Sequence, residues 1–452
     1  MTVDAHLLRG VASAAPPVAW IAERLPTGDF RRIMLKPNWV HHEVSPDFPI
    51  RALITSAALI DAVIEACVAR YPNAETITVG DVPLQSCDFE TMMRQSGMDR
   101  VIAKWRDRTA PRIVFRDLRR ERFRLENGFM VAEPPGDYGD PLGYREVRLD
   151  AASFLDPISG QREKFRVSDY DVQRIQSSHR QGHHRYLIAG SVLAADLFIN
   201  LPKMKTHQKA GLTGALKNLV GCNGEKAFLV HYLKGRHQAG GDEFPSSIAW
   251  PILLQVRVRE ALQKRSRLLF SLLRPVWRAM KKLYGIRTEG TQDNLKKGTF
   301  YLAAGAWYGN DTIWRMVYDL NRIIRFAPPE GGDLAATPQR AYLAIVDGVV
   351  SGEGNGPLQP LPVDSGVVWT AANPLVADLV MAQLMGFDYR KIPCCARYRD
   401  LGDPEWSQVD PAALHLDDHG TPVTGLESLA PLRTYLPSPG WRGHLERTPP
   451  AT

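Results

Sequence analysis

The chain has 452 residues, of which 44% are hydrophobic and 23% charged, as in globular proteins with a substantial core. Its formal net charge of +7 favours anionic partners, but no nucleic-acid partner is expected because no zinc-finger, RNP-type or helix-turn-helix pattern is recognisable. No apolar run approaches the roughly 18 residues of a membrane span, and charges and prolines interrupt the N-terminal segment, which predicts a cytoplasmic protein.

The first part of the chain alternates strand and helix patterns. The segment RRIMLKPNWV predicts a strand that ends at a Lys-Pro-Asn turn, and Ser56 is placed to cap a helix over SAALIDAVIEACVARY. A strand at ETITVGDVP, a helix around DFETMMRQSGMDRVIAKW and a strand at RIVFRDL follow. This alternation predicts βαβ units and a parallel sheet.

The same rhythm returns later in the chain and sets the expected domain boundaries. Strands are predicted at AADLFINLP, AYLAIVDGVV and DSGVVWTA, with a Gly-rich loop at SGEGNGPL and a helix at NPLVADLVMAQLMG. We expect an N-terminal α/β lobe over residues 25–120, an irregular excursion over 121–185, a second α/β lobe over 186–400 and a Pro-rich tail over 401–452. The predicted fold class is therefore α/β, with mostly parallel sheet lobes of βαβ units.

A basic helical segment is expected inside the second lobe, within an insertion at about residues 246–330. Residues 257–287 carry ten Lys or Arg residues against one acid, Glu260, with leucines and aromatic residues interleaved. Two interpretations stay open. The segment is either an interfacial helix on an anionic membrane or a helical hairpin that packs its apolar stripe on the protein.

The cysteines argue against an intrinsic iron–sulfur cluster. Five occur, an odd number with no CxxC pair and no ferredoxin-type run. Cys394 and Cys395 are neighbours, a spacing that rarely directs both sulfurs to one metal ion.

Polar side chains follow four of the predicted strands, where ligands bind in parallel α/β sheets. They are Lys36 and Asn38; Asp81; Lys203, Lys205, Thr206 and His207; and Asp347, Glu353 and Asn355. Each alone is compatible with ordinary turn chemistry. Their recurrence at four equivalent positions favours a binding site.

The stretch LPKMKTHQKAGLTGALKNLVG predicts a strand end, a basic loop and a helix that starts near Gly211. Thr213 and Lys217 are four residues apart on one face of that helix. Lysines close to a helix N-terminus are expected where an anion lies between them, although a basic surface helix is the alternative. The spacing is not that of a P-loop.

Histidines near the middle of the chain are candidates for a divalent metal or for acid–base chemistry. The metal candidates are His183, His231, His237 and Asp242. Their spacing matches no standard site such as HExxH. The cofactor is otherwise unspecified.

These motifs, in this order, resemble the domain of unknown function 362 family, some of whose members are fused to ferredoxin-like iron–sulfur modules. The resemblance spans about residues 30–390 and rests on LKPNWV, VGDVP, DLFINLPKMKTHQKAGLTGALKNLVG, IVDGVVSGEGNGPL and ANPLVADLVMAQLMG. It implies an α/β fold and an enzyme, but no particular activity. The positions that match its motifs are Lys36, Asn38, Asp81, Lys203, Lys205, His207, Lys217, Asn218, Asp347, Glu353 and Asn355. The chain looks like the longer members without a ferredoxin module.

The leading hypothesis is an enzyme that binds a phosphorylated or carboxylated small molecule in a cleft at the strand ends. His207 is the acid–base candidate, and Asp81, Asp347 and Glu353 are proton acceptors or metal ligands. The expected substrate-binding residues are Lys36, Asn38, Lys203, Lys205, Thr206, Lys217, Asn218 and Asn355. The alternatives are a redox-linked protein with a separate iron–sulfur partner and a non-catalytic membrane-surface protein recruited by residues 257–287. A homodimer is left open.

Overall fold

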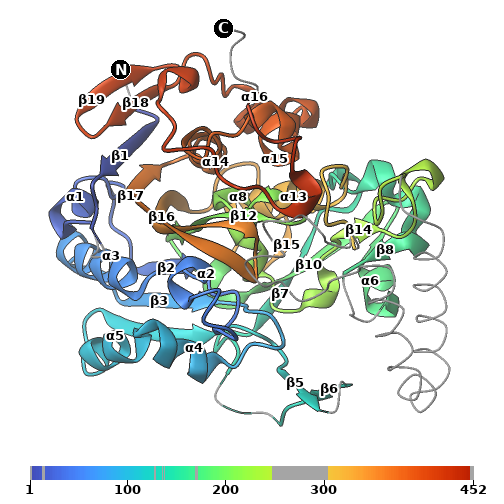
Figure 1. Ribbon diagram of the computed structural model, residues 1–452. Coiled ribbons are helices and arrows are strands. Elements are labelled where there is room, and N and C mark those ends of the chain that lie inside the picture. The colour runs from blue at the N-terminus through green and yellow to red at the C-terminus, as the bar shows by residue number, and fades with distance from the viewer. Residues whose placement is uncertain are drawn as a thin grey trace, which may run out of the picture.

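The computed structural model describes residues 3–12, 16–126, 129–134, 136, 138–167, 172–246 and 304–447. At its centre lies an 11-stranded mixed sheet (Figure 1). Its main path runs through β19 (Thr421–Thr424), β18 (His415–Asp418), β1 (Ala5–Arg9), β17 (Gln359–Ala371), β16 (Ala341–Asn355), β11 (Leu197–Leu201), β2 (Arg32–Pro37), β3 (Thr76–Asp81) and β4 (Arg112–Asp117). β16, β11, β2, β3 and β4 pair in parallel, which confirms the α/β fold class.

Helices connect the parallel strands of the N-terminal region, as predicted. The connections contain α2 (Ile50–Leu53), α3 (Ala57–Arg70), α4 (Phe89–Ser96) and α5 (Met98–Trp105), and α1 (Val18–Ala22) precedes β2. The Ser56 hydroxyl accepts a hydrogen bond from the Leu59 amide at the start of α3, and Asp88 caps α4 in the same way. The predicted cap at Ser56 is therefore confirmed.

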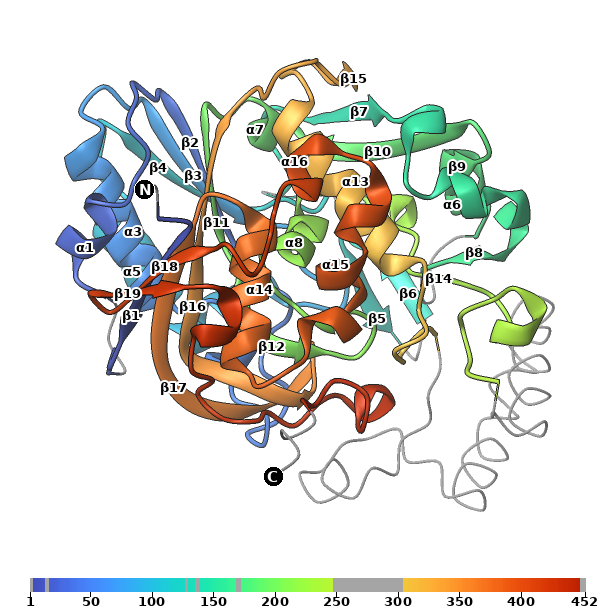
Figure 2. The same cartoon turned by 90° about the horizontal axis from the view of Figure 1, so that it is seen from above.

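The sheet has a hydrophobic core on each face, because alternate residues of a strand point to opposite sides. In β2, Ile33 and Leu35 belong to one core and Met34 to the other. The first core also contains α3 and α5, whereas α13 (Ile313–Phe326) and α14 (Pro374–Leu384) pack in the second. Figure 2 shows these two groups of helices on opposite sides of the strands.

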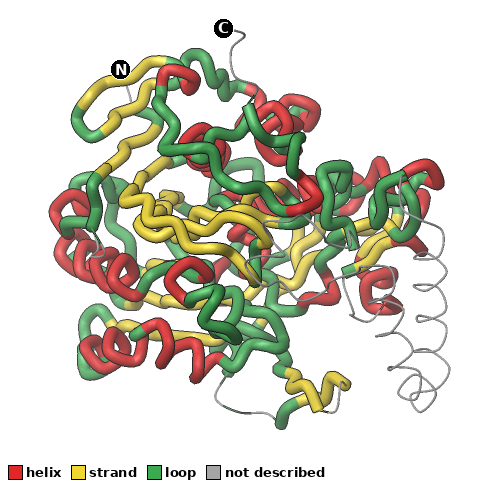
Figure 3. The backbone as a smooth tube through the Cα atoms, in the orientation of Figure 1, coloured by secondary structure: helices red, strands yellow, loops and turns green. Residues whose placement is uncertain are grey.

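A second, smaller sheet flanks the first. It consists of β15 (Gly332–Asp333), β7 (Tyr144–Arg148), β10 (His183–Ala189) and β9 (His179–Arg180). Two pairs, β5 (Phe123–Glu126) with β6 (Phe129–Ala132) and β8 (Phe165–Arg166) with β14 (Tyr232–Leu233), lie outside both sheets. Figure 3 shows these short strands among long loops.

Short helices complete the described part. The α-helices are α6 (Val172–Ser178), α7 (Gly190–Leu193), α8 (Ala215–Asn218), α15 (Pro393–Ala396) and α16 (Pro404–Ser407). Segments of 3-10 helix occur at Asp150–Ala152, Asp156–Lys164, Leu219–Cys222, Lys226–Phe228, His237–Ala239, Tyr389–Lys391, Arg397–Leu401, Leu426–Ser428 and Pro439–Trp441. In the part of the chain that the structure describes, no helix is long and apolar enough to cross a membrane.

The stretch that follows β11 differs from its prediction. Residues expected to form a loop are strand β12 (Lys203–His207), which pairs with β16, and β13 (Gly211–Leu212) folds back on it. The helix begins at Ala215 and not near Gly211, because Gly211 and Gly214 have φ of +80° and +48°, outside the helical region.

The Gly-rich segment after Val350 also differs from its prediction. It was expected to be a loop, but β16 continues through it to Asn355, which pairs with Gln359 of β17. The basic segment 257–287 lies outside the described residues, so both of its interpretations stay predictions.

Candidate functional site

Two buried ion pairs join neighbouring parallel strands, and the first lies at the carboxyl ends of β2 and β3. Lys36 follows the core of β2, and its Nζ lies 2.8 Å from Asp81 Oδ1 at the end of β3. Asp81 Oδ2 also accepts a hydrogen bond of 2.6 Å from the Trp39 amide. Burial raises the pKa of Asp81, while Lys36 and the backbone amides oppose that rise. The predicted strand-end residues Lys36 and Asp81 are thus brought together.

The second ion pair joins β12 to β16. Lys203 Nζ lies 2.9 Å from Asp347 Oδ2, which also accepts a hydrogen bond from the Ser56 amide. Burial lowers the pKa of Lys203, and Asp347 opposes that shift. Both side chains are at most 1% exposed, so this pair is part of the protein interior.

Four further predicted residues are committed to the scaffold near the tip of the β16–β17 hairpin. Lys205 Nζ donates to the Leu53 carbonyl, and Thr206 Oγ1 donates to the Gly354 carbonyl. Glu353 accepts a hydrogen bond from the Leu436 amide, and Asn355 donates to the Gln359 side chain. None of the four lines the cavity described next.

A cavity of about 210 Å³ opens beside the Lys36–Asp81 pair. Its polar lining consists of Asn38, Asp81, His207, Gln208, Lys209, Thr213, Lys217, Asn218, Lys226 and His231. Apolar walls come from Trp39, Val40, Val82, Leu84, Val167, Val220, Pro357 and Leu358. Six of the predicted site residues therefore meet here: Asn38, Asp81, His207, Lys217, Asn218 and the metal candidate His231.

Two lysines of this cavity lack an acidic partner. In the part of the chain that the structure describes, Lys217 Nζ makes neither a hydrogen bond nor an ion pair. Lys226 Nζ donates only to the Val82 carbonyl, at 2.7 Å. Burial lowers the pKa of Lys217 to about 8 and that of Lys226 to about 7. The only carboxylate in the lining, Asp81, is already paired with Lys36.

Backbone contacts fix opposite tautomers of the two cavity histidines. His207 Nδ1 accepts hydrogen bonds from the Lys209 and Ala210 amides, so its proton is on Nε2. His231 Nδ1 lies 3.2 Å from the Leu229 carbonyl and must donate to it, which leaves a lone pair on Nε2. Burial and the neighbouring lysines hold the pKa of both imidazoles well below its usual value.

The tautomers change the expected division of roles. His207 was the acid–base candidate, but its Nδ1 lone pair is occupied by two N–H donors, so the ring is a neutral hydrogen-bond donor. Among the described residues nothing donates to Nε2 of His231, so of the two rings only His231 presents a free acceptor nitrogen.

Asparagines fix the strand ends below the cavity. Asn218 Nδ2 donates to Asn200 Oδ1 at 2.7 Å and to the Lys36 carbonyl at 3.1 Å, and its Oδ1 accepts from Asn38 Nδ2. Asn38 Oδ1 and Thr213 Oγ1 have no hydrogen-bond partner among the described residues, although both are buried.

Asp378 of α14 caps helix α8 from another part of the chain. Gly214 occupies the N-cap position and has no side chain, and the Asp378 carboxylate accepts hydrogen bonds from the Ala215 and Leu216 amides instead. Burial raises the pKa of Asp378 to about 7. This contact positions the helix that carries Lys217.

We expect Asp378→Asn to have a lower free energy of unfolding than the wild type, by an amount that decreases as the pH rises. The variant loses one acceptor for a buried N–H, which costs about 1–3 kcal/mol. The pKa of Asp378 is about 7 in the folded protein and about 4 in the unfolded chain, so the folded wild type binds more protons between these values. Wild-type stability therefore falls with rising pH in that window, and the asparagine variant lacks this fall. Urea denaturation at pH 5 and pH 8 measures the difference, and a deficit that widens with pH would contradict the assignment.

The metal candidates are not assembled. Among the described residues, no three His, Cys, Asp or Glu side chains are placed to hold one metal ion. His231 lines the cavity with the lysines, whereas His237 and Asp242 line a separate cavity of about 320 Å³. Asp242 accepts hydrogen bonds from the Thr312 hydroxyl and the Leu233 amide, a structural role. His183 lies in β10 of the smaller sheet.

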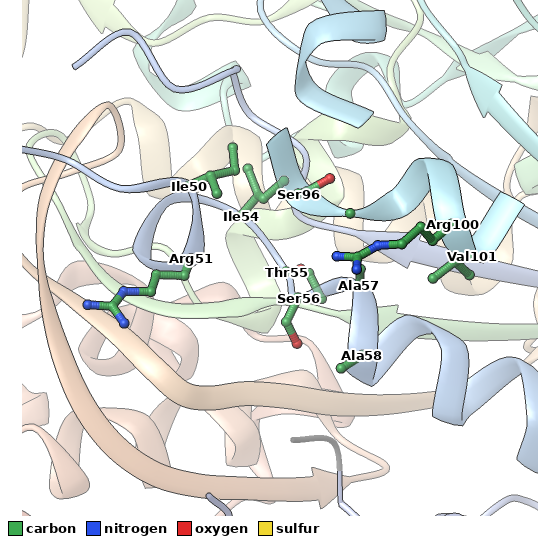
Figure 4. Close-up of a pocket in the computed structure, with 11 residues that line it drawn as sticks. Ile50, Arg51, Ile54, Thr55, Ser56, Ala57, Ala58, Ser96, Arg100 and Val101 are labelled. Atoms are coloured by element: carbon green, nitrogen blue, oxygen red, sulfur yellow. The ribbon is translucent and has the colours of Figure 1, made fainter. Parts of the chain in front are cut away.

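Another cavity, of about 340 Å³, lies between α2, α3 and α5. Figure 4 shows Arg100 extending from α5 toward the start of α3, while Arg51 points away from it. Most of the lining is apolar or small, and none of the predicted site residues contributes to it. We assign it no ligand.

Several functional candidates were missed in the sequence. Lys226 lines the cavity, but it lies in a segment without a recognisable pattern. Asp378 resembles an ordinary polar residue in an apolar helix. The available signal was the carboxylate of Asp378 within the apolar predicted helix ANPLVADLVMAQLMG, because a buried carboxylate needs partners.

Comparison with known families matches the central and C-terminal region of the chain. The model of the domain of unknown function DUF362 matches residues 153–383, more than half of the 452 residues. No curated protein and no solved structure matches the chain. The chain belongs to the domain of unknown function 362 family.

Proposed function

We propose that the protein is a cytoplasmic enzyme whose substrate is an anionic small molecule, phosphorylated or carboxylated, bound in the cavity beside the Lys36–Asp81 pair. The observation that carries this proposal is that Lys217 and Lys226 line the same cavity and have no acidic partner among the residues that the structure describes. Buried amines without a counter-charge are costly, and an anion would stabilise them.

The remaining polar groups of the cavity suit a reaction as well as binding. His207 offers Nε2–H as a donor, and His231 offers the Nε2 lone pair as an acceptor. A substrate hydroxyl or an acidic C–H placed between the lysines and His231 could pass its proton to that nitrogen. Lys36, Lys203 and Asp347 would then act as scaffold and not as ligand contacts.

Binding of inorganic phosphate tests the proposal by isothermal titration calorimetry. We expect Lys217→Met to weaken phosphate binding at least tenfold, since a charge-assisted hydrogen bond contributes about 1.5–3 kcal/mol. Its melting temperature should stay close to that of the wild type, because Lys217 Nζ makes no hydrogen bond or ion pair with the described residues.

Lys104→Met is the matched control. Lys104 lies in α5 and pairs with Asp61 at the surface, away from the cavity lining. This variant should bind phosphate as the wild type does. If wild-type protein binds neither phosphate nor malonate at concentrations up to about 10 mM, the proposed function is wrong.

A further inference from the structure

We infer that the ligand of this cavity is a compact dianion and that its binding is accompanied by proton uptake on Lys226 and Lys217. This inference rests on the proposed function and specifies the charge of the ligand. A phosphate-like oxyanion and a dicarboxylate share the required chemistry, which is two negative charges within one small group.

The inferred charge of the ligand follows from the charged residues that line the cavity. Three lysines line it, Lys209, Lys217 and Lys226, together with the single carboxylate of Asp81. Asp81 is 2.8 Å from Lys36, so its charge is already balanced by a fourth lysine behind the wall. A monoanion would therefore leave the two amines that have no acidic partner only half compensated.

The inferred compact size of the ligand follows from the volume of the cavity. About 210 Å³ is below the range of about 300–1,000 Å³ that is typical of sites for drug-sized molecules. The donors in the lining are the amines of Lys217 and Lys226 and the ring of His207, whose proton is on Nε2. A small group rich in acceptor oxygens fits these donors better than an extended one.

The proton uptake is assigned to the amines of Lys217 and Lys226, each of which lies among charges of both signs. Besides burial, electrostatic interactions affect the pKa of Lys217. They involve the Cys394 thiol of α15, Lys209, Lys36 and Asp81. In the empty cavity its pKa is about 8.

The pKa of Lys226 is affected by the Lys36–Asp81 pair, Lys217 and Arg119. Arg119 is itself paired with Asp117, with 2.6 Å between Nη2 and Oδ2. Its pKa is about 7, so near pH 8 it is mostly neutral in the empty cavity. His207 and His231 stay neutral there because the pKa of each is well below the usual value.

A dianion beside the two amines raises both pKa values, because it favours their charged forms. At pH 8, Lys226 then takes up close to one proton and Lys217 about half of one. The sign follows directly: binding is strongest below pH 7, where both amines are already protonated, and weakens as the pH rises through 7 and 8.

Titration calorimetry with sulfate and methanesulfonate tests the inference at pH 8, in buffers of different ionisation enthalpy. Both probes have a sulfonyl head and neither titrates in this range, but sulfate is a dianion and methanesulfonate a monoanion. We expect sulfate to bind at least tenfold more tightly and to take up about 1.5 protons, with affinity falling about 25-fold between pH 7.5 and pH 8.5. Malonate is the dicarboxylate probe, and its affinity relative to sulfate tells which kind of dianion the cavity prefers.

Variants separate the two amines. Lys217→Arg keeps its charge at all these pH values, so sulfate should still bind while proton uptake falls by about half a proton. Lys226→Met should remove about one proton and weaken sulfate binding. If methanesulfonate binds as tightly as sulfate, or sulfate binds without proton uptake, the inference is wrong although the proposed anion site would stand. If none of the anions binds, the proposed function fails with it.

Discussion

Gly221→Ala should lower the free energy of unfolding by about 3–5 kcal/mol, or prevent folding. A Cβ on Gly221 would lie 1.9 Å from Asp81 Oδ1 and 2.7 Å from Lys36 Nζ. Both atoms belong to a buried ion pair that cannot separate without leaving charges unpaired in the interior. The Gly221 carbonyl also accepts a hydrogen bond from the Val82 amide, so the backbone cannot withdraw freely. Gly221 is thus required for space and not for an unusual backbone conformation.

Urea denaturation of Gly221→Ala measures this loss, and Gly160→Ala is the matched control. A Cβ on Gly160 meets nothing within 4 Å, and its backbone conformation is open to any residue. The control should change stability by less than about 0.5 kcal/mol. A Gly221→Ala protein as stable as the control would mean that the Lys36–Asp81 pair does not hold the geometry described.

Lys203→Met should cost a similar amount, about 3–5 kcal/mol, because it leaves the carboxylate of Asp347 buried without its ion pair. The double variant Lys203→Met/Asp347→Asn should recover much of that loss, since no net charge is then left in the interior. Asparagine keeps an oxygen that can accept the Ser56 amide. Thermal and urea denaturation of the single and double variants measure the coupling between the two side chains.

Ligand binding separates this structural role from a role in the site. Lys203 does not line the cavity, so the folded fraction of Lys203→Met should bind phosphate with the affinity of the wild type. Lys217→Met should behave in the opposite way, with normal stability and weak binding. A stable Lys203→Met protein that binds no phosphate would move the anion site to the β12–β16 pair.

The strand-end rule brought part of the predicted set to the candidate cavity, but it did not separate the side chains that line the cavity from those that belong to the scaffold. Lys36, Asp81 and Asn38 were found because parallel strands β2 and β3 end side by side. Lys203 and Lys205 followed the same rule, yet residues 203–207 continue as strand β12, whose Lys205 reaches the Leu53 carbonyl. Sequence pattern cannot separate these cases, because a buried lysine and a ligand-binding lysine follow a strand in the same way.

Long-range contacts account for most of what the sequence did not show. The His207 and His231 tautomers depend on single backbone groups a few residues away, which no periodicity encodes. Asp378 caps helix α8, which lies 160 residues earlier in the chain. The N-cap residue of that helix, Gly214, has no side chain that could do so. The start of that helix was predicted too early, because a left-handed Gly211 cannot be recognised from its neighbours alone.

The shared central sheet means that the segment matched by the family model cannot fold by itself as it does here. Strand β11 is hydrogen-bonded on one side to β16 and on the other to β2, and β2 precedes residue 153, where the match begins. A fragment cut at that residue would leave β11, which is buried along its whole length here, with an unpaired edge and would favour aggregation. It would also lack Lys36 and Asp81. The family segment and the N-terminal strands therefore have to be inherited, expressed and studied as one piece.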